Sequence, residues 1–230
     1  VHDLSWAAGD AQAKGFLIGA TSGRTTLNGE GLQHQDGHSH ILSSTIPNCL
    51  SYDPAYAYEV AVIIKDGIQK MYVEQENYFY YITTINENYC HPEMPEGAED
   101  GIIKGMHRIK TVNKPKVRLL GSGAILNESI KASDILEKYG IGSEIWSVTS
   151  FNLLRKNGME IERHNQLNPL DESKRSYVEE CFIDSDIPII AATDYMRAYA
   201  EQIRPYISGQ YATLGTDGYG RSDSRKTLRG

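Results

Sequence analysis

One polar loop holds most of the side chains that could do chemistry in this 230-residue chain. Its sequence, GRTTLNGEGLQHQDGHSH, spans residues 23–40 and includes Glu30, His34, Asp36, His38 and His40. Histidine titrates near neutral pH, so it can donate or accept a proton during a reaction. Glycines within the loop would let its backbone come close to a bound molecule. The loop is therefore a candidate for catalysis, with metal binding and structural hydrogen bonding as alternatives.

Metal binding is the weakest of these three uses. His34, His38 and His40, with Asp36, are residue types that could surround zinc. Their H-x3-H-x-H spacing in a glycine-flanked loop lacks the regularity of helical zinc motifs, and the chain contains no HExxH. We therefore predict no metal site here.

The segments around the loop alternate between strand and helix patterns. Apolar or β-branched runs at 15–21, 48–52 and 78–85 predict strands. Asp53 and Pro54 have the residue types of an N-cap and a first helical position, which predicts a helix that begins there. Such alternation predicts a parallel sheet with helices on its faces, and ligands bind at the carboxyl ends of its strands. The His loop follows the first strand at that edge.

A second α/β unit follows a linker rich in proline and glycine at 86–97. In its later part, IPIIAATDYMRAYAEQIRPYI predicts a strand, an aspartate cap at Asp194 and a helix. The fold class we predict is α/β, with two consecutive three-layer units and mostly parallel sheets. The predicted domains are residues 1–95 and 96–230.

Two further stretches have more than one explanation. The GSG turn at 121–123 resembles part of a phosphate-binding turn, but close packing of strand against helix is the simpler explanation. The stretch TDGYGRSDSR at 216–225 has two arginines and two aspartates near a turn. It would form either a self-paired surface loop or a site for an acidic group or a partner protein.

Composition narrows the class of protein. The net charge is −7, with acidic and basic residues mixed, which argues against nucleic acid as a partner. No apolar run approaches the roughly 20 residues needed to span a bilayer. The first residues do not have the pattern of a signal peptide. Three cysteines without CxxC spacing suggest reduced thiols in a cytoplasmic protein.

Four long and unusual stretches resemble a known family, the first, decarboxylating component of the bacterial pyruvate dehydrogenase complex. The type is the homodimeric one related to transketolase. The stretches are WAAGDAQAKGFLIGATSGRTTLNGEGLQHQDGHSH, TIPNCLSYDPAYAYEVAVI, YYITTINENY and LGTDGYGRSDSR. The resemblance extends over essentially all of the chain.

The resemblance implies a piece of a longer protein. Residues 1 to about 95 would be the later part of the domain that binds the pyrimidine ring of thiamin diphosphate. Residues 96–230 would be most of a C-terminal domain. The family's GDG motif and downstream asparagine, which hold the diphosphate and magnesium, are not in this sequence. The main cofactor-binding residues are then outside the chain, and we expect the chain alone to be inactive.

The resemblance also implies an activity and roles for the loop. The family decarboxylates pyruvate and reductively acetylates the lipoyl group of the dihydrolipoyl acetyltransferase. In that family the histidine that maps onto His34 lies over the reactive carbon of the cofactor, and the glutamate that maps onto Glu30 shapes the site. His38, His40 and Asp36 match in type and are further candidates for substrate binding. The family pattern has glutamate where this chain has Gln35, so we assign that position no role.

Other functions stay open on sequence alone. The chain could come from another 2-keto-acid dehydrogenase or a transketolase-type enzyme. It could be a non-catalytic dimerisation fragment, or a zinc hydrolase that uses the histidines. Because the family forms homodimers with sites at the interface, we expect exposed apolar surface here.

Overall fold

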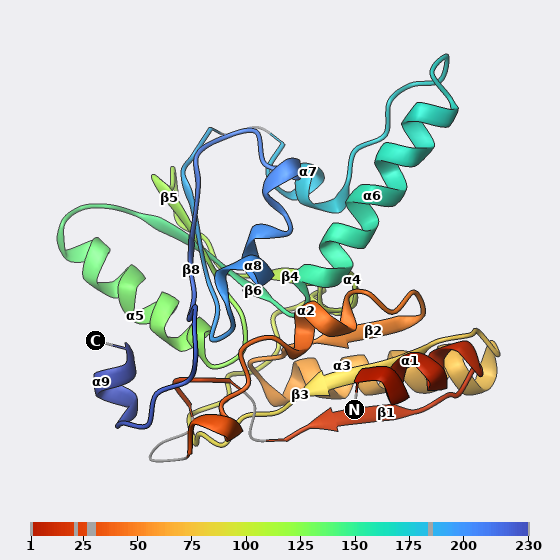
Figure 1. Ribbon diagram of the computed structural model, residues 1–230. Coiled ribbons are helices and arrows are strands. Elements are labelled where there is room, and N and C mark those ends of the chain that lie inside the picture. Colours follow the sequence, from red (N-terminus) through yellow and green to blue (C-terminus); the bar gives the residue numbers. More distant parts are fainter. Residues whose placement is uncertain (1, 21–22, 27–30, 184–185, 230) are drawn as a thin grey trace.

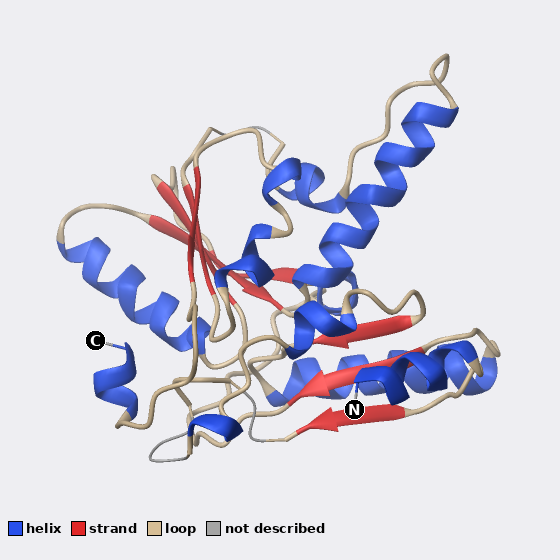
Figure 2. Cartoon of the chain, viewed as in Figure 1, coloured by secondary structure: helices blue, strands red, loops and turns tan. Residues whose placement is uncertain are grey.

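The computed structural model describes residues 2–20, 23–26, 31–183 and 186–229. Two sheets make up the body of the structure, and helix α6 extends away from it (Figure 1). The strands of the two sheets run in different directions (Figure 2). Among the described residues, no helix is both long enough and apolar enough to cross a membrane.

The first sheet contains three parallel strands in the order β1-β3-β2. Its elements are β1 (Phe16–Gly19), η1 (Leu32–His34), α2 (Ser39–Ser43), β2 (Cys49–Tyr52), α3 (Ala57–Ile68), η2 (Gln69–Val73) and β3 (Phe79–Thr83), preceded by α1 (His2–Asp10). Side chains alternate across the central strand β3, because successive residues point to opposite faces. Tyr80 and Ile82 pack with Ile63 of α3, whereas Phe79 packs with Ile46 and Cys49. Apolar contacts therefore cover both faces.

The second sheet contains five strands in the order β4-β6-β5-β7-β8, with β4 as an antiparallel edge strand. Its elements are α4 (Glu99–Lys104), β4 (Met106–Lys110), β5 (Val117–Gly121), α5 (Ile125–Lys138), β6 (Ser143–Val148), α6 (Phe151–Leu167), α7 (Tyr177–Cys181), β7 (Ile189–Ala192), α8 (Arg197–Glu201), η3 (Arg204–Tyr206), β8 (Tyr211–Leu214) and α9 (Arg225–Arg229). Ile145 packs with Leu126 of α5, and Leu120 and Val148 belong to the cluster that includes Phe151 of α6. The predicted class, two α/β units with mostly parallel sheets, is confirmed.

The two sheets meet at the carboxyl ends of their strands. The peptide N–H of Asp53, just after β2, donates to Thr149 after β6, and the Asp53 carbonyl accepts from Gly123 after β5. The Ser150 hydroxyl donates to the carbonyl of Ser51. We call this contact the seam. Our domain boundary at 95/96 lies between β3 and α4 and stays a prediction.

Glu59 of α3 is fully buried in the seam. Its Oε2 atom accepts from the peptide N–H groups of Ala55 and Tyr56, at 2.6 and 3.0 Å. Its Oε1 atom lies 2.7 Å from Nε2 of His107 on β4 and accepts from the Ser147 hydroxyl of β6 at 2.6 Å. One carboxylate thus joins the start of a first-sheet helix to two strands of the second sheet.

Both aspartates that we predicted as helix caps have other partners. Helix α3 begins at Ala57, and Glu59 satisfies the N–H groups at its start, so a helix capped by Asp53 is wrong. Helix α8 begins at Arg197, and the Asp194 carboxylate accepts from Thr25 instead. In each case a tertiary contact takes the side chain that local sequence would assign to a cap: Asp53 accepts from Thr83 of β3, and Asp194 accepts from Thr25 across the seam.

Replacing Leu120 by alanine tests whether the apolar cluster of the second sheet is a core of the fold. Leu120 has no exposed surface and packs in the larger apolar cluster. Leu120→Ala should lower the free energy of unfolding by about 2–5 kcal/mol, because it removes buried methyl groups and leaves a cavity. Urea unfolding measures the loss. Leu170→Ala is the control, since Leu170 is 98% exposed, and an equal loss in both variants would contradict this core.

Candidate functional site

The described start of the His loop is held by Asp194, which follows β7. The peptide N–H groups of Arg24 and Thr25 each donate to this carboxylate at 3.0 Å, and so does the Thr25 hydroxyl. Burial raises the pKa of Asp194, while the hydrogen bonds from Thr25 act in the opposite direction. A second-sheet residue therefore fixes a loop that begins in the first sheet.

His34 lies on the exposed side of the loop. It ends the short 3-10 turn η1, and both it and Leu32, the first residue of the turn, are exposed. The imidazole is therefore accessible to a molecule that binds at this surface. Glu30, its predicted catalytic companion, lies outside the residues that the structure describes.

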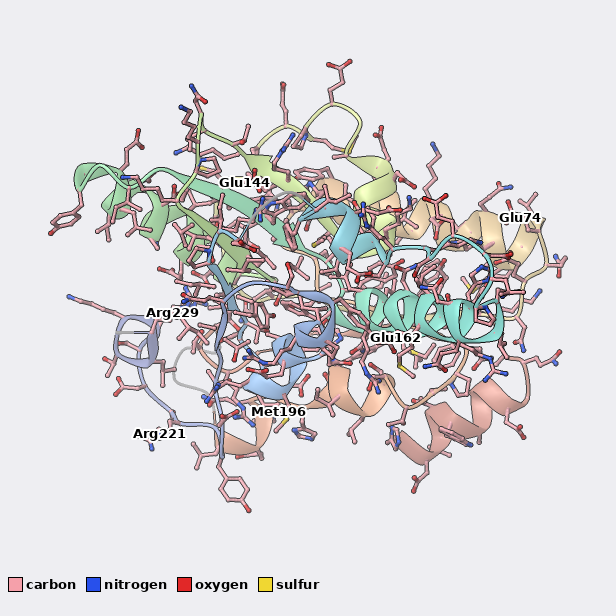
Figure 3. All side chains as sticks on the ribbon, turned by 90° about the horizontal axis from the view of Figure 1, so that it is seen from above. Glu74, Glu144, Glu162, Met196, Arg221 and Arg229 are labelled. Carbon is pink, nitrogen blue, oxygen red and sulfur yellow. The ribbon has the colours of Figure 1, made fainter. Side chains whose placement is uncertain are left out.

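Gln35 is buried directly beside His34, although we assigned it no role. Its side-chain amide donates to the carbonyl of Arg221, and the peptide N–H of Arg221 donates back to Oε1, both at 2.6 Å. A carboxylate has no N–H for the first of these bonds. The sequence shows an amide at this position but gives no sign of its partner. Met196 and Arg221 lie along the blue C-terminal segment (Figure 3).

Asp36 and His38 both lie at the start of helix α2. The Asp36 carboxylate accepts from the peptide N–H groups of His38 and Ser39, at 3.1 and 3.0 Å, and from the Ser39 hydroxyl. It therefore satisfies donors at the start of α2, as a capping side chain does. His38 is exposed at the N-cap position of that helix.

His40 is fully buried in the seam. Its ring stacks on Tyr199 and meets the edge of Tyr195, with centroids 4.8 and 4.7 Å away. Nε2 lies 3.0 Å from the Thr83 hydroxyl, which donates to Asp53 at 2.7 Å. Because that hydroxyl proton goes to Asp53, Nε2 of His40 carries the hydrogen. Burial lowers the pKa of His40 to about 4, against the charge of Asp36.

Asp53 ends this buried chain of hydrogen bonds. Burial raises its pKa to about 7, against hydrogen bonds from Thr83 and Ser122. The Asp53 carboxylate lies against the GSG turn, where a Cβ on Gly123 would be 2.8 Å from Oδ2. A Cβ on Gly121 would be 2.6 Å from the Leu126 backbone. Close packing, rather than a phosphate site, therefore explains these glycines.

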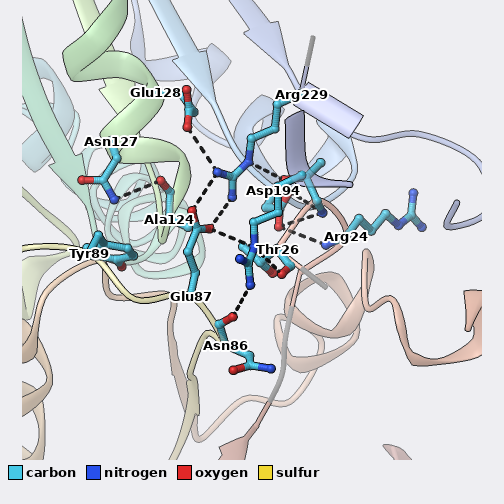
Figure 4. Close-up of polar contacts among 12 residues, drawn as sticks. Arg24, Thr26, Asn86, Glu87, Tyr89, Ala124, Asn127, Glu128, Asp194 and Arg229 are labelled. Atoms are coloured by element: carbon cyan, nitrogen blue, oxygen red, sulfur yellow. Dashed lines mark hydrogen bonds and ion pairs between the residues drawn. The ribbon is translucent and has the colours of Figure 1, made fainter. Parts of the chain in front are cut away.

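The stretch at 216–225 leads into α9, whose arginines bind first-sheet residues. Arg225 donates to the Thr26 carbonyl at 2.8 Å. Arg229 donates to Glu87 through both terminal nitrogens, to Glu128, and through Nε to the Thr25 hydroxyl at 3.0 Å (Figure 4). The self-paired loop that we considered is not what forms here.

The sequence candidates that the structure describes therefore do not converge on one point. Within the described residues, no group of three or more His, Cys, Asp or Glu side chains is placed to hold a metal ion. The peptide N–H of Gly123 in the GSG turn already donates to Asp53. These residues do not fit the diphosphate end of thiamin diphosphate or its magnesium. The site consists of the exposed His34 on a loop with buried anchors.

Comparison with known proteins gives the family. Residues 1–92 match the pyruvate dehydrogenase E1 component middle domain, and residues 105–230 match the transketolase-like TK C-terminal domain. The chain belongs to the pyruvate dehydrogenase E1 family. It is 60% identical to the pyruvate dehydrogenase E1 component of Escherichia coli K12 and 59% identical to that of Pseudomonas aeruginosa. Both alignments cover the whole chain but only 26% of the relative, so the chain spans about a quarter of their length.

Solved structures agree on the fold of this pyruvate dehydrogenase E1 chain. A transketolase from Campylobacter jejuni superposes with a TM-score of 0.69, over 98% of this chain and 30% of that one. A transketolase variant from Pichia stipitis gives the same score over the same shares. The TM-scores show a common fold, and at identities of 17% and 15% the likeness says nothing about the substrate. The predicted family is confirmed, while the roles of His34 and Glu30 stay predictions.

The buried state of His40 has a consequence for stability. Its pKa lies near 4 in the folded chain against 6.5 for the free side chain. The stability that the neutral His40 ring contributes is therefore fully present above pH 6.5. As the pH falls toward 4, the free energy of unfolding decreases by up to about 3 kcal/mol. The raised pKa of Asp53 has the opposite effect on the free energy of unfolding, over an overlapping range of pH. The quantity to measure is therefore the difference in free energy of unfolding between wild type and His40→Gln, from unfolding in urea. That difference should shrink from pH 7 to pH 4, and a constant difference would contradict the burial of a neutral ring.

Proposed function

We propose that the protein containing this chain is a thiamin-diphosphate-dependent pyruvate dehydrogenase. It decarboxylates pyruvate and reductively acetylates the lipoyl group of a dihydrolipoyl acetyltransferase. The observation that carries the proposal is 60% identity to the E. coli pyruvate dehydrogenase E1 component over 234 aligned residues. Because the chain covers 26% of that relative, the activity belongs to the whole protein. We expect the chain by itself to be inactive.

The contribution of this chain would be the imidazole of His34. His34 is exposed, whereas its neighbour Gln35 is buried and bound through two hydrogen bonds. An exposed side chain on an anchored backbone is suited to donate a hydrogen bond or a proton to a molecule held by another part of the protein. We propose this role for His34, with Glu30 as a companion that shapes the site.

The cofactor would supply the carbanion chemistry of decarboxylation. Since the described residues do not fit its diphosphate or magnesium, we propose that the main binding residues lie outside this chain. His38 stays a candidate substrate contact because it is exposed. Asp36 and His40 are engaged in internal hydrogen bonds, and we now assign them to supporting the loop.

Apolar surface supports the proposal of a homodimer. Leu17 and Ile18 on the edge strand β1 are 43% and 52% exposed. Together with Leu42 and Phe79 they line an apolar hollow. Exposed apolar surface of this kind marks contacts with other protein surfaces. Sedimentation of the whole protein would test the dimer. The acetyltransferase partner and a cytoplasmic location are proposals from the family.

A transketolase-type activity is the second candidate, because transketolases share the fold. Identity of 15–17% to them, against 60% to the pyruvate dehydrogenase E1 component, favours pyruvate. Turnover of pyruvate, longer 2-keto acids and sugar phosphates by the whole protein separates the two candidates.

Replacing His34 by alanine tests its role in the whole protein. We expect release of carbon dioxide from pyruvate, with thiamin diphosphate and magnesium added, to fall by roughly 10²–10⁴. The reason is that alanine removes a group able to handle protons at the reacting centre. His164→Ala is the matched control, since His164 lies in the last turn of α6 and should leave turnover unchanged. Equal turnover by wild type and His34→Ala would refute the proposed role.

A further inference from the structure

Two groups of contacts hold the loop on either side of His34, and both come from the same C-terminal segment, residues 194–229. We call residues 23–26 the front anchor and residues 35–37 the rear anchor. At the front anchor, the Thr25 hydroxyl donates to Asp194 and accepts from Arg229 Nε. The hydroxyl thus donates one hydrogen bond and accepts one, so Thr25 connects the two charged groups.

Arg229 extends the front anchor to the rest of the molecule. Its two terminal nitrogens contact both carboxylate oxygens of Glu87, at 3.1 and 2.6 Å, and one of them also contacts Glu128. The Arg229 side chain is only 13% exposed. Bidentate contacts of this kind have a fixed geometry and are stronger when they are sheltered from water. Arg229 therefore joins the loop, the segment after β3 and helix α5 in one place (Figure 4).

The rear anchor is formed by hydrogen bonds to peptide groups of the C-terminal segment. Gln35 binds both the N–H and the carbonyl of Arg221, as a neighbouring strand would. Two residues later, the Gly37 carbonyl accepts from the peptide N–H of Met196 at 2.9 Å. A Cβ on Gly220 would be 2.4 Å from Gln35 Oε1, so the amide is also packed closely. His34 is adjacent to this anchor in sequence.

We propose that the C-terminal segment is a clamp on the His loop and that Gln35, Asp194 and Arg229 are positioning residues for His34. They act by limiting the conformations of the backbone on either side of the imidazole. This inference rests on the function proposed for His34. The clamp itself concerns how often the loop opens, which can be measured without an activity assay.

Arg24 provides a built-in probe of the clamp. Its side chain is buried, its guanidinium donates to the Thr216 carbonyl, and its peptide N–H is bound by Asp194. Trypsin must extract this arginine to cut after it, so cleavage there requires the front anchor to open. The guanidinium must also leave Gly37 of the rear anchor, where a Cβ would lie 2.0 Å from Arg24 Nε. Cleavage after Arg118, which is buried in β5, requires the second sheet to open instead. The ratio of the two cleavage rates separates opening of the loop from unfolding of the domain.

The test uses the whole protein with Arg229→Met and, separately, Gln35→Met. Each variant should raise the rate of cleavage after Arg24 by about tenfold relative to cleavage after Arg118, since cleavage tracks the population of the open form. Arg204→Met is the control, because Arg204 makes a bidentate pair with Glu201 in the same segment. A ratio in both test variants no higher than in Arg204→Met would overturn the clamp.

Turnover then links the clamp to His34. Arg229→Met should lower carbon dioxide release from pyruvate several-fold in the wild-type background and should have no further effect in His34→Ala. An equal loss in both backgrounds would show that the clamp does not act through His34 and would overturn its positioning role. If His34→Ala kept full turnover while the cleavage ratio still rose, the proposed function of His34 would fail and the clamp on the loop would stand.

Discussion

The buried carboxylate of Glu59 is the interaction on which the arrangement of the two sheets depends. It accepts hydrogen bonds from two peptide groups at the start of α3 and from Ser147 of β6, and it lies beside His107 of β4. A buried charge is costly unless its hydrogen-bonding capacity is filled, and here donors from both sheets are needed to fill it. The first sheet therefore has one favourable position on the second.

The candidate site follows from that position. Once the sheets are fixed, Asp194 lies beside Thr25, and Arg221 lies beside Gln35. The His loop belongs to the first sheet by sequence but takes its conformation from the second. His34 remains outside these contacts, exposed next to a buried neighbour. His34 is thus both exposed and part of an anchored loop. A side chain that must contact a molecule bound by another part of the protein needs both properties.

Much of the fold could be predicted from sequence because it depends on local patterns. The runs FLIG, CLSY and FYYIT form strands, since short runs of apolar, β-branched and aromatic side chains favour strands. The family was also accessible, because the motifs around the His loop are long and unusual. These signals are contained within single stretches of the chain.

The partners of individual polar residues could not be predicted in the same way. Asp53 and Asp194 have the residue type and position of helix caps, yet each is used by a residue far away in sequence. His40 looks equivalent to His34 in the printed loop, but only one of the two is buried. Gln35 seemed to have lost a charge, whereas the structure uses its amide to bind a peptide group. Such assignments depend on what lies across the seam.

The sequence distance between the anchors affects the order in which the protein matures. Thr25 and Asp194 are 169 residues apart, Gln35 and Arg221 186, and Thr25 and Arg229 204. At about 5–20 residues per second, a ribosome needs roughly 10–40 s to add such a length. The strands of the first sheet are complete at Thr83, so they leave the ribosome well before the residues that hold the loop. During that interval the emerging chain carries the strands of the first sheet without the residues that hold the His loop.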